Sequence, residues 1–399
     1  MGTLLSDVAQ YRPTVAIIDA AAIAENVRVL RQRVAPAAVC AVVKADGYGH
    51  GAVAGAQAAL HAGATWLAVA LVEEAIELRL HGVRAPILVL SEFPRGAGTA
   101  IIANALTATV YSHERIAEMS EAAAVTGVAA AVHLKVDTGM RRVGAQPGDA
   151  LTLASAISSD PHLSLGGTFT HFAVSDEPSN PFTSLQHQRF IGILTELRRA
   201  GIDPGIVHAA NSGGGIVHSA SHLDMVRFGV SIYGNSPDAA LDCASFGVSL
   251  TPVLTLRSEV SHVKVVRAGE AVSYGLIWTA PTDRVIATVP IGYADGVPRR
   301  LGPLGMPVLL GGRRCPIVGR VTMDQILIDA GPAGAIDPAG FKKPQVSRGD
   351  EVVLLGSQGT ERITPDEWAL ALDTISYEIT CGISKRVPRL VVGLPTKGD

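Results

Sequence analysis

The sequence predicts a (β/α)8 barrel followed by a second domain rich in β-strands. Between residues 14 and 242, short β-branched runs alternate with helical patterns of i, i+3, i+4 apolar spacing, giving roughly eight βα units. Beyond that point, strand-like runs are separated by glycine-rich turns and few helical patterns occur. This alternation favours a closed parallel barrel. An open parallel sheet would show the same alternation and remains the alternative.

The expected elements of the first domain follow directly from these runs. Strands are expected at residues 15–18, 39–43, 65–70, 87–90, 106–110, 131–136, 165–170, 206–208 and 225–227. Helices are expected between them, for example at 20–34, 72–81, 113–125 and 184–200. Residues 235–246 contain Pro, Asp and Ser and are interpreted as a linker. The barrel should therefore span residues 12–242.

The second domain, residues 243–399 together with 1–11, is expected to be all-β. Its strands are predicted at 254–266, 285–290, 307–310, 314–321, 325–328 and 351–355. Residues 330–348 should form an irregular Pro- and Gly-rich loop.

Composition excludes several classes of function. The formal net charge is −3 and no basic run occurs, which argues against a nucleic-acid or acidic-membrane partner. Apolar runs stop well short of the roughly 18 residues that a membrane span needs. The N-terminus lacks a signal-peptide pattern, and the four cysteines have no CxxC spacing, so reduced thiols in a cytoplasmic protein are expected. The sequence contains no HExxH motif and no clustered His/Asp spacing, so a metal-dependent hydrolase is not expected.

The most informative segment is AVVKADGYGHG, residues 41–51. A lysine at the end of a buried strand is costly to desolvate, so Lys44 should have a lowered pKa and a nucleophilic amine, as a Schiff-base lysine requires. The plain alternative is a surface lysine that closes a strand. Gly47, Gly49 and Gly51 are expected to leave backbone N–H groups open to an anion at a helix start.

Further polar residues follow other predicted strands. The carboxyl ends of barrel strands meet at one rim, so these side chains should converge there with Lys44. A lone strand-end His or Arg is more often structural, but five occupied strand ends suggest a site with a lysine, an anion-binding region and several cations or imidazoles. That chemistry fits pyridoxal phosphate. The residues at the other four ends are Lys135 with Asp137 and Arg142; His171; His208 with Asn211 and Ser212; and Arg227.

In these motifs the chain resembles the alanine racemase family, which uses pyridoxal phosphate to interconvert L- and D-alanine. The resemblance covers nearly the whole chain in family order. Besides residues 41–51 it includes KVDTGMRRVG from Lys135, TFTHFAVSDE around His171, HAANS from His208, VRFGVSIYG from Val226, VSYG around Tyr274, IGYADGVPR from Ile291, VGRVTMDQ from Val318 and TISYEI from Thr374. It implies a barrel, a β-domain and a homodimer with active sites shared between subunits.

The resemblance also implies catalytic roles. Lys44 would carry the cofactor and act as a base on one face of the substrate Cα, and Tyr274 of the other subunit would act on the opposite face. Racemisation needs such a pair, because one group removes the proton and the other returns it. His171 and Arg227 would belong to the hydrogen-bond network around Tyr274, and Arg227 would face the pyridine nitrogen, where many related enzymes place a carboxylate.

The remaining roles implied by the resemblance concern binding. Arg142 would contact the cofactor's phenolic oxygen and the substrate carboxylate, and Met323 and Asp324 of the other subunit would border the substrate pocket. Lys135 matches a position that is often carbamylated in the family. The cofactor phosphate would be held by Tyr48, Ser212, Tyr377 and the backbone N–H groups of Gly229 and Val230.

The activity implied is alanine racemisation, supplying D-alanine for peptidoglycan. The nearest alternative is a racemase of serine or of several amino acids. A pyridoxal-phosphate carrier resembles the barrel alone and lacks the domain that holds Tyr274. A decarboxylase of basic amino acids shares the architecture but depends on a carboxylate where this chain has Arg227.

Overall fold

The computed structural model describes residues 11–333 and 346–394. These divide into two compact units, one of residues 20–251 with Leu394 and one of residues 11–19, 252–333 and 346–393. Apart from Leu394, the first unit is one continuous stretch of chain, whereas the second combines a short N-terminal segment with the C-terminal part. The two units are described separately below.

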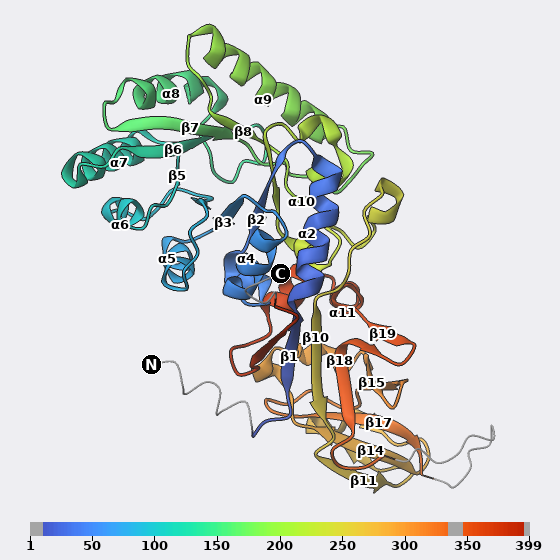
Figure 1. The fold of residues 1–399 in the computed structure, drawn as a ribbon. Helices are drawn as coiled ribbons and strands as arrows, with labels where there is room; N and C mark the ends of the chain where they lie inside the picture. Colours follow the sequence, from blue (N-terminus) through green and yellow to red (C-terminus); the bar gives the residue numbers. More distant parts are fainter. Residues whose placement is uncertain (1–10, 334–345, 395–399) are drawn as a thin grey trace. The chain divides into compact units, whose positions relative to one another are not determined.

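Residues 20–251 form the expected barrel of eight parallel strands (Figure 1). Two four-stranded sheets, in the orders β4-β3-β2-β9 and β5-β6-β7-β8, join through a parallel bridge between Leu88 and Thr107. On the other side the Asp224 N–H donates to the Val207 carbonyl (3.0 Å), which closes the ring between β8 and β9. The strands are β2 (Ala38–Val42), β3 (Trp66–Val69), β4 (Ile87–Val89), β5 (Ala108–Val110), β6 (Ala130–Lys135), β7 (Leu163–Phe169), β8 (Ile206–His208) and β9 (Met225–Phe228).

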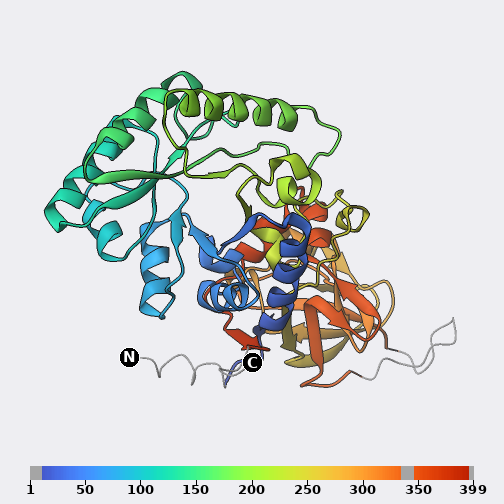
Figure 2. The same cartoon turned by 45° about the horizontal axis from the view of Figure 1, so that its top comes forward.

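Helices lie along the outer side of these strands, as both ribbon views show (Figures 1 and 2). In α7 the apolar spacing that predicted a helix becomes the buried face, with Ile116, Met119 and Ala123 turned inward. Ser112 caps its start and Gly127, with φ 67°, ends it. The helices are α2 (Ala20–Val34), α3 (Lys44–Tyr48), α4 (Ala52–His61), α5 (Val72–Leu80), α6 (Gly98–Ala103), α7 (His113–Thr126), α8 (Ala150–Ser159), α9 (Phe182–Arg199) and α10 (Ser212–Val217).

The first predicted barrel strand, 15–18, belongs instead to the second unit. It forms β1 (Val15–Asp19), which pairs antiparallel with β10 (Leu254–Glu259) and parallel with β20 (Arg389–Val392). Its burial alternates along its length, whereas β2 is buried almost continuously, as a strand between a packed barrel interior and outer helices should be. The division between the units therefore falls at residues 19/20 and 251/252, and the predicted linker 235–246 lies within the barrel unit.

The second unit is built mainly from antiparallel strands. Among its described residues, one sheet runs β16-β15-β18-β10-β1-β20 with β19 paired to β18, a second runs β11-β14-β17, and β12 pairs with β13. The strands are β10 (Leu254–Glu259), β11 (His262–Val266), β12 (Ala271–Val272), β13 (Trp278–Thr279), β14 (Arg284–Val289), β15 (Pro307–Leu310), β16 (Arg313–Pro316), β17 (Ile326–Pro332), β18 (Glu351–Gln358), β19 (Glu361–Ile363) and β20 (Arg389–Val392).

Three expectations for this unit need correction. The predicted strand 254–266 is two strands, because β10 and β11 pair in different sheets. The unit also contains two helices, α11 (Pro365–Leu372) and α12 (Ser376–Cys381), so it is not all-β. The predicted loop at 330–348 starts later than expected, since β17 extends to Pro332, and residues 334–345 lie outside the described part of the chain.

The structure can also be searched for membrane-spanning helices, disulfides and metal-binding clusters. Within residues 11–333 and 346–394, no helix combines the length and apolar character required to cross a bilayer. None of the four cysteines is in a disulfide. The same residues contain no cluster of three or more His, Cys, Asp or Glu side chains suited to a metal ion.

Gly205 lies where two barrel strands pack so closely that a side chain would not fit. It has φ +63°, and a Cβ there would lie 2.5 Å from the carbonyl carbon of Gly166, whereas a Cβ at Gly201, with φ +78°, meets nothing within 4 Å. Gly201→Ala should cost about 1 kcal/mol from the left-handed backbone. Gly205→Ala should cost about 1–3 kcal/mol more because backbone atoms must move. Urea denaturation of both variants measures this difference, and equal costs would contradict it.

Candidate active site

Lys44 lies in a left-handed turn that follows β2. The strand ends at Val42, and the half-buried Lys44 begins α3. Ala45, Asp46, Gly47 and Tyr48 have φ values of 52°, 51°, 61° and 54°, a conformation that costs L-residues roughly 1–2 kcal/mol each. Such strain persists only where the surroundings enforce it, and it is commonest at functional sites.

Two side-chain carboxylates, one from outside the turn and one from within it, help to hold the turn in place. Glu74 Oε1 accepts from the Ala45 N–H at 2.6 Å, and Asp46 Oδ1 accepts from the Ala52 N–H at 2.8 Å. The second bond ties the turn to the start of α4. Together they fix the backbone from which the Lys44 and Tyr48 side chains project, and the Lys44 Nζ lies 5.9 Å from the centre of the Tyr48 ring.

The expectation that three glycine N–H groups would be open to an anion is wrong. The N–H groups of Gly47, Gly49 and Gly51 donate to the carbonyls of Val43, Ala45 and Asp46, at 3.0, 3.0 and 2.8 Å. A left-handed turn satisfies its own donors in this way. The glycines permit the backbone conformation, and what the turn contributes to the site is the side chains of Lys44 and Tyr48.

A small polar cradle forms where Tyr48 of this turn meets two other segments. The Gly229 N–H donates to Ser212 Oγ at 3.0 Å, and a Cβ at Gly229 would lie only 2.3 Å from Tyr48 Oη. Val230 follows at the start of a 3-10 helix, and Asn211 caps α10 through the Gly214 N–H (3.0 Å). The structure thus brings together Tyr48, Ser212, Gly229 and Val230, whereas Tyr377 lies on α12 in the other unit.

Arg227, on β9, is a cation almost fully buried in the barrel interior. One terminal nitrogen donates to His208 Nδ1 at 2.9 Å, and the other lies within hydrogen-bond distance of the Thr170 carbonyl (2.9 Å), the Ala209 carbonyl (3.0 Å) and His171 Nδ1 (3.1 Å). Burial lowers the pKa of Arg227 to about 10, which leaves the guanidinium charged at neutral pH.

The donor character of Arg227 assigns the protons of the neighbouring histidines. A guanidinium donates only, so His208 Nδ1 and His171 Nδ1 must accept, and each ring carries its proton on Nε2. His208 Nε2 then donates to His133 Nδ1 at 3.0 Å. Burial and the charge of Arg227 lower the pKa of His133 to about 4 and those of His171 and His208 well below their usual value. All three are neutral at pH 7.

His133 was not among the residues singled out from the sequence. It sits in mid-strand on β6, and room for its ring exists because Gly167 lacks a side chain: a Cβ there would lie 2.6 Å from the ring. The pair Gly166-Gly167 inside a predicted strand was the one available signal, because glycine within a strand often marks close approach by a neighbour.

Four basic side chains lie near His171. Lys44, Lys135, Arg142 and Arg227 all lower its pKa through their charge, after the larger effect of burial. Lys135 is buried, and its Nζ donates to the Leu90 carbonyl at 3.1 Å. Burial first, and then the charges of Arg227, Arg142 and Lys44, lower the pKa of Lys135 to about 7. This concentration of positive charge at the carboxyl ends of the strands suits an anionic ligand.

Tyr274, Met323 and Asp324 all lie in the second unit, and their side chains are exposed. Tyr274 is 73% exposed and Met323 is 52% exposed. Tyr274 follows Ser273, whose backbone has φ 65° and whose hydroxyl donates to the Arg320 carbonyl at 2.8 Å. The residues that come together within the barrel unit are therefore Lys44, Tyr48, Lys135, Arg142, His171, Ser212, Arg227, Gly229 and Val230.

A parallel barrel with a lysine, a small polar cradle and clustered basic side chains at its strand ends is typical of a class of enzyme that holds a phosphorylated ligand beside a reactive amine. Two family models cover the chain: the alanine racemase N-terminal domain matches residues 18–237 and the alanine racemase C-terminal domain matches residues 253–391. The chain belongs to the alanine racemase family.

Individual relatives agree with this assignment. An alanine racemase of Symbiobacterium thermophilum is 45% identical over 387 residues, which is 97% of this chain and 99% of the relative. The solved alanine racemase of D-cycloserine-producing Streptomyces lavendulae superposes with a TM-score of 0.87 at 38% identity, covering 96% of this chain and 97% of that one. That of Bacillus anthracis with bound L-Ala-P gives 0.86 at 36% identity, covering 98% and 96%.

The neutral histidines predict a stability that falls in acid. Unfolded histidines titrate near pH 6.5, above the folded pKa of about 4 for His133, so between these values the unfolded state binds more protons. Stability should therefore fall as the pH drops below about 6.5. In His133→Asn, which retains an acceptor for His208, the loss between pH 7 and 4.5 should be smaller by about 2 kcal/mol. Urea titrations measure it.

The exposed His262 provides the matched control, because His262→Asn makes the same substitution outside the buried histidine network. If His133→Asn and the parent protein lost the same stability over this range, His133 would not be held neutral by its surroundings.

Proposed function

We propose that the protein interconverts L- and D-alanine with pyridoxal phosphate as cofactor, working as a homodimer. The observation that carries the proposal is the group of basic side chains near His171, together with the cradle of Tyr48, Ser212 and Gly229. This arrangement offers one place for a phosphate and another for a carboxylate at the same strand ends. Family membership over nearly the full chain supports alanine as the substrate.

The residues present fit the cofactor. The Gly229 N–H already donates to the Ser212 hydroxyl oxygen at 3.0 Å, and only glycine at 229 leaves room for the Tyr48 hydroxyl. These groups, with the Val230 N–H and Tyr377, would bind the phosphate, and Lys44 would anchor the cofactor covalently. Bound pyridoxal phosphate supplies an electron-withdrawing ring that makes the substrate's α-proton acidic.

Two groups on opposite faces of Cα would move the proton. The Lys44 amine would accept it from one enantiomer, and the Tyr274 hydroxyl of the second copy would return one to the other face. His171, with its proton assigned to Nε2, would donate to the Tyr274 oxygen and so stabilise the phenolate. Arg142 would hold the substrate carboxylate, while Met323 and Asp324 of the second copy would border the pocket.

Arg227 would face the pyridine nitrogen. Its terminal nitrogens are committed to carbonyls and to histidine Nδ1 atoms, and it stays protonated at neutral pH. A fixed donor cannot supply a proton to the pyridine nitrogen as a carboxylic acid would, so the carbanion would be less delocalised and transamination disfavoured. The same positive charge argues against a decarboxylase that needs a carboxylate there.

The homodimer is supported by apolar side chains exposed near Tyr274. Leu276 and Ile277 follow it in sequence and are exposed, as is Met323. Large exposed apolar side chains close together usually mark an interface. A second copy of this chain would cover them and would bring Tyr274 to the barrel site. The role proposed for the activity is D-alanine supply for peptidoglycan, in the cytoplasm.

A racemase of serine, or of several amino acids, is the second candidate. The exposed Arg141 beside Arg142 is the feature that favours it, because a long basic side chain there alters how the substrate approaches the site. Measuring L-serine alongside L-alanine in a chiral assay of the cofactor-loaded protein distinguishes the two.

The two-base proposal predicts a specific defect in Tyr274→Phe. In deuterated water the cofactor-loaded parent protein should racemise L-alanine and place deuterium on Cα. Without the phenol, racemisation should fall by about 100-fold or more, while Lys44 still exchanges the α-proton of one enantiomer without inversion. Chiral chromatography with mass detection separates inversion from exchange. Normal racemisation by Tyr274→Phe would refute the second base.

Lys135 is proposed to be carbamylated. Its lowered pKa, about 7, leaves much of the amine neutral at physiological pH, and the neutral amine attacks CO2: a C–N bond forms and a proton leaves to water. The resulting anion would lie among Lys44, Arg142 and Arg227. Labelled bicarbonate should give a carbonyl NMR signal that Lys135→Gln abolishes and that the exposed-site control Lys264→Gln retains. Full activity without the signal would remove the proposal.

A further inference from the structure

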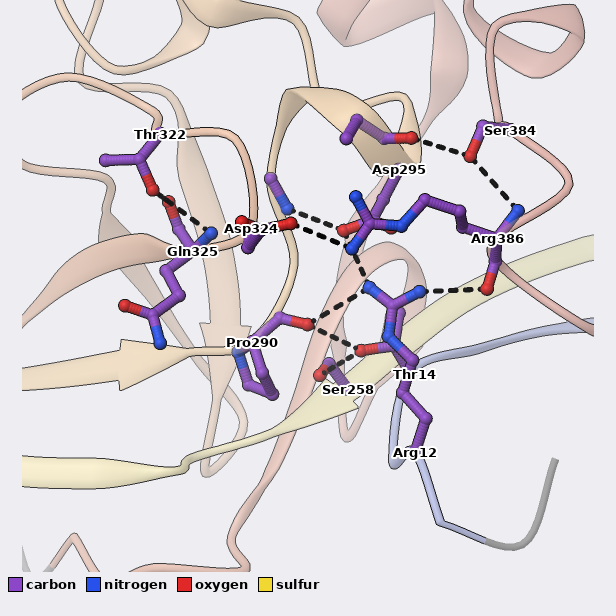
Figure 3. A network of polar contacts seen from close by, with 12 residues as sticks. Arg12, Thr14, Ser258, Pro290, Asp295, Thr322, Asp324, Gln325, Ser384 and Arg386 are labelled. Carbon is purple, nitrogen blue, oxygen red and sulfur yellow. Dashed lines mark hydrogen bonds and ion pairs between the residues drawn. The ribbon is translucent and has the colours of Figure 1, made fainter. Parts of the chain in front are cut away.

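Arg386 links two carboxylates of very different exposure in the second unit (Figure 3). Its Nη2 lies 2.8 Å from Asp324 Oδ1, and its Nε lies 3.3 Å from Asp295 Oδ1. The Asp324 side chain is 59% exposed, whereas that of Asp295 is 0% exposed. One guanidinium therefore serves a buried anion and an anion that faces solvent.

The buried carboxylate has further partners that do not depend on Arg386. Asp295 Oδ2 pairs with Arg12 Nη2 at 2.6 Å and accepts from the Gly292 N–H at 2.9 Å. Arg12 in turn donates to the Arg386 carbonyl at 2.8 Å and to the Pro290 carbonyl at 3.3 Å. This anchoring holds the backbone at Arg386 and orients its side chain toward Asp324 (Figure 3).

The turn that carries Asp324 is fixed by backbone hydrogen bonds that do not involve Arg386. The Tyr293 and Ala294 N–H groups donate to the carbonyls of Thr322 and Met323 at 2.9 and 3.0 Å, and the Thr322 N–H donates to the Gln325 carbonyl at 3.0 Å. The Thr322 hydroxyl also donates to that carbonyl at 2.8 Å. Since these bonds already position the turn, the contribution that Arg386 adds at Asp324 is charge.

We propose that Arg386 determines substrate specificity by neutralising Asp324. This rests on the proposed function, in which Asp324 borders the substrate pocket. Arg12, Arg386, Asp295 and Asp324 together carry two positive and two negative charges, so the group is neutral as a whole. Without Arg386 the exposed Asp324 carboxylate would repel the substrate's carboxylate and attract a cationic side chain. With Arg386 the pocket favours a small amino acid with a neutral side chain.

The test compares kcat/KM for L-alanine and L-lysine in the cofactor-loaded dimer. Arg386→Gln should raise the lysine-to-alanine ratio about tenfold or more, because one unpaired charge at contact distance changes binding by about that factor. The alanine loss should appear mainly in KM. Arg386→Lys, which keeps the charge, should retain most of the parent ratio. Adding Asp324→Asn to Arg386→Gln should return the ratio toward that of the parent.

Two further variants keep the test decisive. Asp324→Asn alone, at an exposed site that threatens the fold little, should move the ratio in the opposite direction because it leaves Arg386 partly unpaired. Arg257→Gln breaks another ion pair of this unit, Arg257 Nη1 to Glu351 Oε2 at 2.8 Å with similar exposure, and should not change the ratio.

The outcomes separate the two proposals. If kcat/KM for both substrates fell in parallel in Arg386→Gln, or if Asp324→Asn left the ratio unchanged, Arg386 would be a structural residue and the specificity proposal would be overturned. Absence of alanine racemisation in the parent protein would instead refute the proposed function.

Discussion

The buried charge of Arg227 constrains most of the barrel interior. A guanidinium without water must find acceptors from the protein, and this one finds two carbonyls and two imidazole nitrogens. That requirement fixes the tautomers of His208 and His171, extends through His208 to His133, and keeps all three rings neutral. The same charge lowers the pKa of Lys135 and raises the cost of any further cation nearby. An anionic ligand relieves this concentration of charge.

Backbone strain has a comparable role on the other side of the site. The four left-handed residues after Lys44 would cost several kcal/mol in an isolated peptide. Two hydrogen bonds offset part of that cost: Glu74 accepts from the Ala45 N–H, and Asp46 accepts from the Ala52 N–H at the start of α4. The result is a lysine and a tyrosine projecting from a hydrogen-bonded turn. Precise placement of a reacting amine matters more for catalysis than local stability does.

The sequence predicted the barrel well because its signal is repeated: eight alternations of strand and helix agree with one another. It failed where a local pattern has two tertiary solutions. The run at 15–18 resembles a barrel strand, and only pairing with β10 and β20 decides otherwise. Three glycines after Lys44 suggested open N–H groups, but whether a glycine turn closes its own hydrogen bonds depends on dihedral angles that composition does not specify. His133 was missed because a strand-centre histidine acquires its partner only when two distant strands pack.

The exposed residues of the second unit were identified through resemblance, and their local chemistry explains why spacing alone could not find them. Tyr274, Met323 and Asp324 lie on turns, where no periodic pattern indicates which side chain faces a ligand. Arg386 is similar, since its significance comes from two carboxylates that are distant in sequence. Such groups become interpretable only when contacts are known.

The placement of β1 has a consequence for biosynthesis. The barrel is one unbroken stretch, so it can fold as soon as its last strand leaves the ribosome. The strand that precedes it must wait, because its parallel neighbour β20 follows the whole barrel in the chain and is made after it. At typical rates of elongation this delay lasts tens of seconds, during which an unpaired strand edge needs protection from self-association.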